Sequence, residues 1–482
     1  MAQPFAEPCA SGIIRAAARV PAPDLTPARR RVLLAACVLA SAMVFIDGSA
    51  LTVALPKLRA YFGADLASVQ WILNGYVLAL ASLTLVGGAL ADVYGKARVL
   101  SISCLAFGIA SAACALAPSV PWLIVARVVQ GIAAAILAPT SLSFIGAIYP
   151  DEERSRAIGV WASASALTTA GGPVLGGWLT ESAGWQWVFA INPPLALVAV
   201  GLILACAPVD RPQPRRFDFV GAAILAFGLG ALAWALGQIG RGDCAAATPC
   251  WMQGASVVVS AALALAAIVG YGAWERATDH PMTPPRLLAN KLFVSLNLAT
   301  LLIYAGIAIM FFQLSFDLLD RRHLSPTEAG LAFLPFTLAV GLLSQVFGAM
   351  ADKLGPRPML MAGSAGAALA YVAMALGASA SVLLGVIAPM ALLGISLAVL
   401  VAPLTAAVLS SLPAADEGLA SGVNNAVSRI AQLAGIALAA GVAPYPFGYE
   451  TGLAAAALAS LAAALVVAAT MPPGRIASAA PA

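Results

Sequence analysis

The sequence predicts an all-α membrane protein in which two six-helix halves and two inserted helices give fourteen transmembrane helices. Three observations lead to this fold class: the composition, the number of long apolar runs, and an internal repeat. Of the 482 residues, 61% are hydrophobic and only 10% are charged, and the mean hydropathy is +0.94. A soluble globular chain carries about 25% charged residues, which cover its surface. The composition therefore excludes a large soluble protein.

Fourteen apolar runs are long enough to cross a bilayer. A helix needs about 20 residues to cross roughly 30 Å of hydrocarbon. Backbone groups in lipid must form their hydrogen bonds within the segment, so each run is predicted to be a helix. The runs begin near Arg31, Val69, Arg98, Pro121, Ala157, Trp187, Phe219, Trp251, Leu292, Glu328, Met359, Val382, Gly418 and Thr451.

Lysine and arginine predict the orientation, because cytoplasmic loops of membrane proteins carry an excess of both. With the N-terminus in the cytoplasm, 18 of the 25 basic residues fall on the cytoplasmic side and 5 on the outer side, while Arg127 and Arg429 lie inside spans. This distribution places both termini in the cytoplasm. Residues 1–31 show no apolar signal-peptide region, and the first run is long enough to remain in the membrane.

The chain also repeats itself. Gly88-Ala-Leu-Ala-Asp92 returns 260 positions later as Gly348-Ala-Met-Ala-Asp352, and Leu137-Ala-Pro139 returns after 264 positions as Val401-Ala-Pro403. Two parallel six-helix halves around a midplane site are the plan of secondary transporters. We therefore divide the chain into a cytoplasmic tail, a first half, an inserted pair of helices, a second half and a cytoplasmic C-terminal tail, at residues 1–30, 31–208, 209–290, 291–471 and 472–482.

Asp47 is the first candidate for a functional residue. It lies in the middle of the first apolar run, and it is the one acid that the sequence places deep inside such a run. A charge at that depth costs roughly 2.5–3.5 kcal/mol even on the most lenient scale. Arg127 lies inside the fourth run, and its guanidinium is always charged. The two residues are predicted to form a proton site, the alternative being a purely structural pair.

Other polar and aromatic residues inside the runs are candidates for a substrate cavity. Each is about as well explained by a hydrogen bond between helices as by a ligand contact. Three of them, at positions 425, 429 and 432, share one helix face by their spacing. The candidates are Asn74, Tyr76, Gln130, Tyr304, Gln313, Asn424, Asn425, Arg429 and Gln432.

Three stretches resemble signature motifs of the major facilitator superfamily. Gly88-x-Leu90-x-Asp92-x-x-Gly95-Lys96-x-Arg98 is similar to motif A, Leu123-x-x-x-Arg127-x-x-Gln130-Gly131 to motif B, and Gly171-Gly172-Pro173-Val-Leu-Gly176-Gly177 to motif C. The resemblance implies that the first stretch forms a cytoplasmic gate together with Asp352 of its repeated copy. It also implies antiport and hence export, because motif C marks antiporters in that superfamily. By their chemistry alone, the small residues of the third stretch predict close helix packing.

The string around Asp47 and residues 185–193 are similar to two signatures of the 14-helix drug:proton antiporters (EmrB/QacA type). This resemblance covers about residues 30–470. It implies a multi-pass antiporter of the inner cell membrane that exports small amphiphilic drugs by alternating access and so confers antibiotic resistance. Such a protein is not an enzyme, binds no nucleic acid, and uses the proton gradient in place of a cofactor. The sequence leaves open whether a periplasmic adaptor takes part.

The residues alone leave two other functions open: proton-coupled uptake or exchange of a metabolite, and a membrane sensor or scaffold. No Gly-x-x-x-x-Gly-Lys-Ser/Thr string occurs, so the chain has no phosphate-binding loop of its own. The two histidines, His280 and His323, lie in polar connectors, and we expect no metal site. Cys244 and Cys250 share a predicted outer loop, where a disulfide and two free thiols are equally compatible with the spacing.

Overall fold

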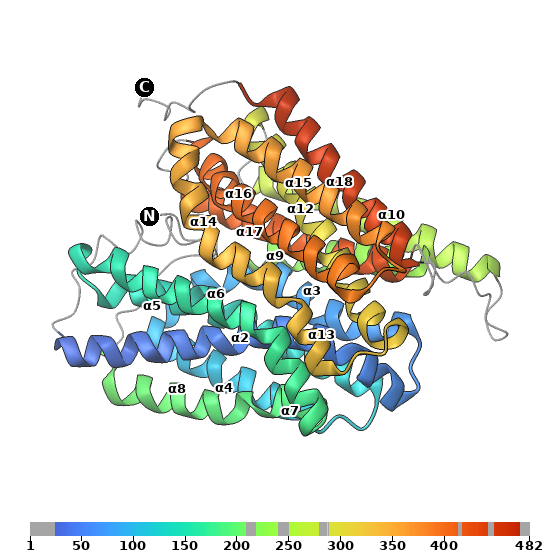
Figure 1. Ribbon diagram of the computed structural model, residues 1–482. Helices are drawn as coiled ribbons and strands as arrows, with labels where there is room; N and C mark the ends of the chain where they lie inside the picture. Colours follow the sequence, from blue (N-terminus) through green and yellow to red (C-terminus); the bar gives the residue numbers. More distant parts are fainter. Residues whose placement is uncertain are drawn as a thin grey trace.

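The computed structural model describes residues 25–208, 218–239, 250–278, 287, 289–412, 417–441 and 448–472, which form long helices in two groups (Figure 1). The first group runs from blue to green in the figure. Its members are α2 (Pro27–Phe62), α3 (Leu66–Tyr94), α4 (Lys96–Ala115), α5 (Val120–Ile148), α6 (Asp151–Ser182), α7 (Gln186–Ala190) and α8 (Asn192–Cys206).

The second group runs from yellow to red and includes two short π-helical turns, η1 and η2. Its members are α12 (Lys291–Phe316), η1 (Asp317–Arg321), α13 (Pro326–Ala332), α14 (Leu334–Leu354), α15 (Pro356–Leu376), η2 (Leu383–Ile387), α16 (Ala388–Ser410), α17 (Glu417–Gly441) and α18 (Gly448–Thr470). Between the two groups in sequence lie α9 (Phe219–Ile239) and α10 (Cys250–Ala277), which pack against each other.

Within the described residues, ten helices are long and apolar enough to cross a membrane. They are α2, α4, α5, α7 with α8, α10, α12 with η1, α13 with α14, α15, η2 with α16, and α18. The prediction of an all-α chain with many membrane spans is therefore confirmed. The count of fourteen spans, and the side of the membrane on which the termini lie, stay predictions.

Polar residues in the short connections start several of these helices. Asp65 accepts a hydrogen bond from the backbone N–H of Ser68 at 2.8 Å and so caps α3. Asn290 caps α12 in the same way, at 3.0 Å from the N–H of Phe293. Ser325 and Glu328 form a reciprocal capping box at the start of α13. These caps bond backbone N–H groups that a helix leaves without an internal partner.

Two glycines with positive φ make matching turns in the two groups. Gly95 joins α3 to α4 with φ 97°, and Gly355 joins α14 to α15 with φ 84°, 260 positions later. Only glycine adopts such angles without strain. We call this side of the bundle the Gly95 end. The opposite side is the Gly63 end, after the glycine that ends α2 with φ 59°.

The core of each group is apolar. Leu33, Phe107 and Trp161 are wholly buried in the first group, as is Phe333 in the second, where Phe293 is 1% exposed. Large apolar side chains also cover the outside, including Leu204, Leu369 and Leu465, which are 72%, 60% and 70% exposed. An apolar outer surface of this kind suits lipid, where polar groups must be satisfied internally.

The two groups meet along two seams. At the first, α6 packs against α13 and α14, and at the second, α3 packs against α17. The inserted helix α9 contacts both α3 and α17, so it covers the second seam, and Trp71 of α3 lies 5.5 Å from Trp234 of α9 between ring centroids. At the Gly63 end of the first seam, the backbone of α13 at Pro326 lies against Gly177 of α6.

Candidate functional site

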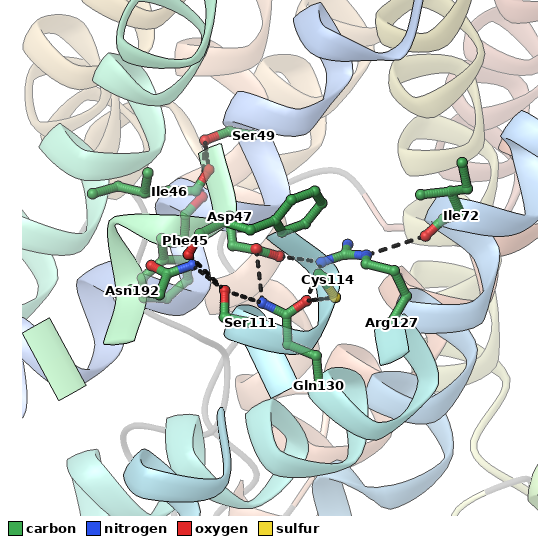
Figure 2. A network of polar contacts seen from close by, with 11 residues as sticks. Phe45, Ile46, Asp47, Ser49, Ile72, Ser111, Cys114, Arg127, Gln130 and Asn192 are labelled. Carbon is green, nitrogen blue, oxygen red and sulfur yellow. Dashed lines mark hydrogen bonds and ion pairs between the residues drawn. The ribbon is translucent and has the colours of Figure 1, made fainter. Parts of the chain in front are cut away.

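A buried ion pair lies in the first group, between α2 and α5. Asp47 and Arg127 are both wholly buried, and Nη1 of Arg127 donates a hydrogen bond to Oδ2 of Asp47 (Figure 2). The structure thus brings together the two residues that the sequence singled out by their charge. Removing one partner of such a pair typically costs about 3–5 kcal/mol, because the other charge stays buried alone.

Gln130, one turn along α5 from Arg127, bonds to both members of the pair. Its Nε2 donates to Oδ1 of Asp47 at 2.9 Å, and its Oε1 accepts from Nη1 of Arg127 at 2.7 Å. The same amide donates to the hydroxyl of Ser111 at 3.1 Å and accepts from the thiol of Cys114 at 3.5 Å. All four hydrogen-bonding positions of the amide are used, so Gln130 is held in one orientation.

Ser111 and Asn192 extend the network to α4 and α8. The hydroxyl of Ser111 accepts from Nδ2 of Asn192 at 2.9 Å and donates to the carbonyl of Phe189 at 2.9 Å. Figure 2 shows these side chains converging on Asp47 from separate helices. Sequence reasoning gave no role to Ser111, Cys114 or Asn192. Only the position of Asn192 inside the stretch 185–193 pointed toward it.

Arg127 has further anchors on α3. Its Nε donates to the carbonyl of Ile72 at 3.1 Å, and its guanidinium lies 4.1 Å from the centroid of the Tyr76 ring. A cation over an aromatic face is stabilised by the ring quadrupole. These contacts do not involve Asp47, so they hold Arg127 in place whichever protonation state the acid adopts.

The glycine-rich stretch of α6 brings that helix close to the ion pair and to the second group. A side chain at Gly176 would collide with the backbone of Ala50, three residues along α2 from Asp47. One residue on, Gly177 faces the backbone of Pro326 in α13. The small residues thus let one helix touch both the Asp47 helix and the opposite group.

The remaining cavity candidates lie on α3 of the first group and on α12 and α17 of the second. Asn424 bonds to Thr300 at 3.4 Å, and Gln313 donates to the carbonyl of Ala439 at 3.4 Å. Nη1 of Arg429 donates to Gln432 at 3.3 Å. The other candidates are buried or partly buried in their own helices: Asn74, Tyr76, Tyr304 and Asn425.

The predicted gate lies at the Gly95 end, where the turns at Gly95 and Gly355 take matching conformations. Lys96 begins α4, and Arg98 is exposed in its first turn. The side chains of Asp92 and Asp352 lie outside the described part of the structure, as does the burial of Gly88. Cys244 and the side chain of Cys250, the first residue of α10, lie outside it as well.

The sequence did not point to a second buried acid, Asp317, at the junction of α12 and η1. It is wholly buried and forms ion pairs with Arg321 and with Arg322, the latter at 2.8 Å. Arg322 also donates to the carbonyls of Ala380 and Ala378, at 2.7 and 2.9 Å. Asp47 is therefore not the only buried acid, although Asp317 lies at a helix end and is paired locally.

Comparison with known proteins finds a family model and solved structures that match this chain. A family model described as Major Facilitator Superfamily matches residues 37–274 and 296–481. The crystal structure of the peptide transporter POT in complex with sulfate is similar over 95% of this chain and 97% of that chain, with a TM-score of 0.69 and 17% sequence identity. At that identity the likeness concerns the fold alone.

Two curated relatives are more similar in sequence. The multidrug resistance protein B homolog of Mycobacterium tuberculosis is 34% identical over 331 residues, which are 68% of this chain and 60% of that protein. The chain thus spans less than two thirds of that relative. The lincomycin resistance protein of Streptomyces lincolnensis is 30% identical over 450 residues, 90% of each chain.

Proposed function

Because the chain belongs to the major facilitator superfamily, we propose that it exports small amphiphilic compounds from the cell in exchange for protons. The two groups of helices would alternate between a state open to the cytoplasm and a state open to the outside. The names of the relatives, which refer to multidrug and lincomycin resistance, support drugs and antibiotics as the substrate class. The proposed location is the inner cell membrane.

The observation that carries this proposal is the buried network around Asp47. A wholly buried carboxylate is paired with one arginine and held by one amide. When Asp47 binds a proton, the ion pair with Arg127 ends, while the hydrogen bonds through Gln130 and the contacts of Arg127 with α3 remain. A proton that crosses the membrane down 100 mV supplies roughly 2.3 kcal/mol to the cycle.

The contacts between the two groups support a state that is closed at the Gly63 end. Close contacts join the groups at the Gly63 end: Gly177 against Pro326, Arg59 to Asp320 at 3.7 Å, and Glu181 to the N–H of Thr327 at 3.1 Å. The distribution of lysine and arginine assigns the Gly63 end to the outside. On that assignment the structure is closed to the outside, and Asp92 with Asp352 belongs to the cytoplasmic gate.

Fourteen spans follow if four further helices cross the membrane. The helices α3, α6, α9 and α17 have 29, 32, 21 and 25 residues, each long enough for about 30 Å of hydrocarbon. Both termini would then lie in the cytoplasm, and α9 with α10 would be the inserted pair.

Transport by everted membrane vesicles tests the proposed function. Vesicles that contain the chain should accumulate a fluorescent drug when respiration makes their interior acidic, and an uncoupler should stop the accumulation. Vesicles without the chain are the control. A chain that instead drives accumulation in right-side-out vesicles would be an uptake carrier, and a chain inactive in both preparations would be a sensor or scaffold.

A further inference from the structure

Two amide side chains on α3, Gln70 and Asn74, are wholly buried and have no hydrogen-bond partner at either amide atom. Among the buried amide side chains that the structure describes, they are the only two with both atoms unpaired. Buried polar groups in native proteins nearly always form hydrogen bonds, because burial removes their hydrogen bonds with water and an unpaired group then costs free energy. The pair therefore calls for a partner other than the chain itself.

The two amides lie at the same depth in the bundle as the ion pair. Arg127 donates to the carbonyl of Ile72, which stands midway between Gln70 and Asn74 along α3. With 3.6 residues per helical turn, the side chains at 70 and 74 share one face, and Ile72 points to the opposite face. The proton site thus contacts one side of α3, and the amides lie on the other.

The face that carries the amides is turned toward the second group of helices. Further along the same face, Ala81 packs in an apolar cluster with Leu433 of α17 and Leu229 of α9. The internal repeat gives the same direction, because Gly330 of α13 follows Gln70 by 260 positions and packs against the α6 backbone across the first seam. Gln70 and Asn74 therefore lie at the second seam, between the groups that must move apart during transport.

We propose that Gln70 and Asn74 form a subsite that binds an uncharged polar group of the transported compound, such as an amide, carbonyl or hydroxyl. Each side chain offers a donor and an acceptor and carries no charge, so its complement is a group that also donates or accepts. This inference rests on the proposed function and assigns one substrate contact within it. Because α3 also holds Arg127, a ligand on this face and a proton on Asp47 both act on the position of one helix.

The test replaces the amides with apolar side chains of similar size, as Gln70→Leu and Asn74→Leu, in the full-length purified protein. Chloramphenicol, which is uncharged and bears an amide and hydroxyls, is the first probe. Tetraphenylphosphonium, a cation with no hydrogen-bonding group, is the second. Asn297→Leu is the matched control, because Nδ2 of Asn297 already donates to the carbonyl of Phe293 at 2.9 Å. Dissociation constants and melting temperatures are measured for each protein.

We expect each α3 variant to bind chloramphenicol about three- to tenfold more weakly, the change that one or two hydrogen bonds produce. Binding of tetraphenylphosphonium should stay within about twofold, in the range of a neutral change. The melting temperature without ligand should be unchanged or higher, since an unpaired buried amide has been removed. Asn297→Leu should alter neither dissociation constant.

Two results would overturn the subsite. The first is unchanged chloramphenicol binding in both variants, or a wild-type protein that binds tetraphenylphosphonium and not chloramphenicol. The second is an equal loss of both probes together with a lower melting temperature, which would mark the amides as structural. A wild-type protein that binds neither probe and moves no drug in vesicles would contradict the proposed function itself, and the subsite with it.

Discussion

Gly131 and Gly394 occupy matching places in the two groups of helices. Gly131 of α5 packs against the backbone of α3 at Tyr76, and Gly394 of α16 packs against α14 at Phe336. A Cβ atom added at Gly131 would lie 3.0 Å from the Cα of Tyr76, and one added at Gly394 would lie 2.8 Å from the Cα of Phe336. The two glycines are 263 positions apart. The same close approach of two helices is thus built twice, and positions around it can be compared directly.

The side chains that surround this approach differ in kind. One turn before Gly131, the first group has Arg127, and the same step from Gly394 leads to Met390 in the second group. Gln130 likewise corresponds to Leu393. Both counterparts are wholly buried in an apolar core. A repeated backbone therefore holds a charged network in one copy and an apolar core in the other, and the fold itself does not require the charges.

The largest expected effect comes from removing the charge of Asp47. Asp47→Asn keeps the shape of the side chain and one acceptor oxygen, which can still bond Arg127, so the protein should still reach the membrane. Proton-driven drug accumulation in everted vesicles should fall to the level of vesicles without the chain. Uncoupler-sensitive transport at the wild-type rate would remove Asp47 from the coupling mechanism.

The second prediction gives Arg127 the residue that stands at the matching position of the second group, Met390. Arg127→Met should lower the free energy of unfolding by about 3–5 kcal/mol, because Asp47 is left buried without its counter-charge. The double variant Asp47→Leu with Arg127→Met should recover most of that loss, since an apolar pair often replaces a buried ion pair without cost. Chemical unfolding of the purified proteins gives both values. Transport should be absent in both, and a double variant that is no more stable than Arg127→Met would contradict the comparison.

The two copies of the gate offer a third comparison. Asp92→Asn should slow turnover strongly while drug binding from the cytoplasmic side stays nearly intact, because a gate residue changes the balance of states rather than the pocket. Asp352→Asn should slow it less, because the second copy has Pro356 and Pro358 in place of Lys96 and Arg98. Rates and affinities are measured in the same vesicles. An affinity loss in Asp92→Asn that matches its loss of rate would assign the residue to the site or to the fold.

The fourth prediction concerns the first seam. Gly177→Ala would place a methyl group against the Pro326 backbone, and Gly171→Ala is its control because nothing lies within 4 Å of that position. Overpacking typically costs about 1–3 kcal/mol, which here opposes closure at the Gly63 end. A cysteine introduced at Thr327 should react faster with an impermeant maleimide in Gly177→Ala than in Gly171→Ala. Equal rates would show that the seam does not depend on this contact.

The smallest effect is expected at Glu181, in the exposed last turn of α6. Hydrogen bonds from the hydroxyl and backbone N–H of Thr327 lower the pKa of Glu181 below its ordinary value of 4.5. A lowered pKa means that this contact is fully present above pH 4.5 and is lost only as the pH falls through the lower value. Glu181→Gln should therefore leave the pH dependence of the transport rate unchanged between about pH 5.5 and 8. A shifted profile would place part of the proton coupling outside the first group.

Much of the helical layout could be predicted because lipid imposes long, uninterrupted apolar segments. The runs expected near Trp251 and Leu292 correspond to helices that begin at Cys250 and Lys291. The ion pair was also visible in the sequence, since a charge inside an apolar run stands out. Asp317 was not, because an acid at the end of a run, followed within five residues by Asp320, Arg321 and Arg322, is typical of a solvated loop.

The uncharged part of the network could not be predicted in the same way. Ser111 and Asn192 are 81 positions apart in sequence and meet only after α4 and α8 pack together. A serine or asparagine inside a helix has the same local pattern whether it bonds its own backbone, a neighbouring helix or a ligand. Gln130 was expected to line the cavity, and its hydrogen bonds instead join it to the ion pair.

The inserted helices α9 and α10 make the two seams between the groups of helices unequal in their exposure to the bilayer. Helix α9 covers the seam between α3 and α17, and α10 lies against α9. Over the other seam, the described residues place no additional helix, and Leu167 of α6 and Leu342 of α14 are 73% and 72% exposed. A compound dissolved among the lipid tails thus meets α9 and α10 at the second seam. At the first seam it meets the contact between the two groups of helices directly. Two symmetric halves would expose two equivalent seams to the lipid, whereas the two seams of this protein differ.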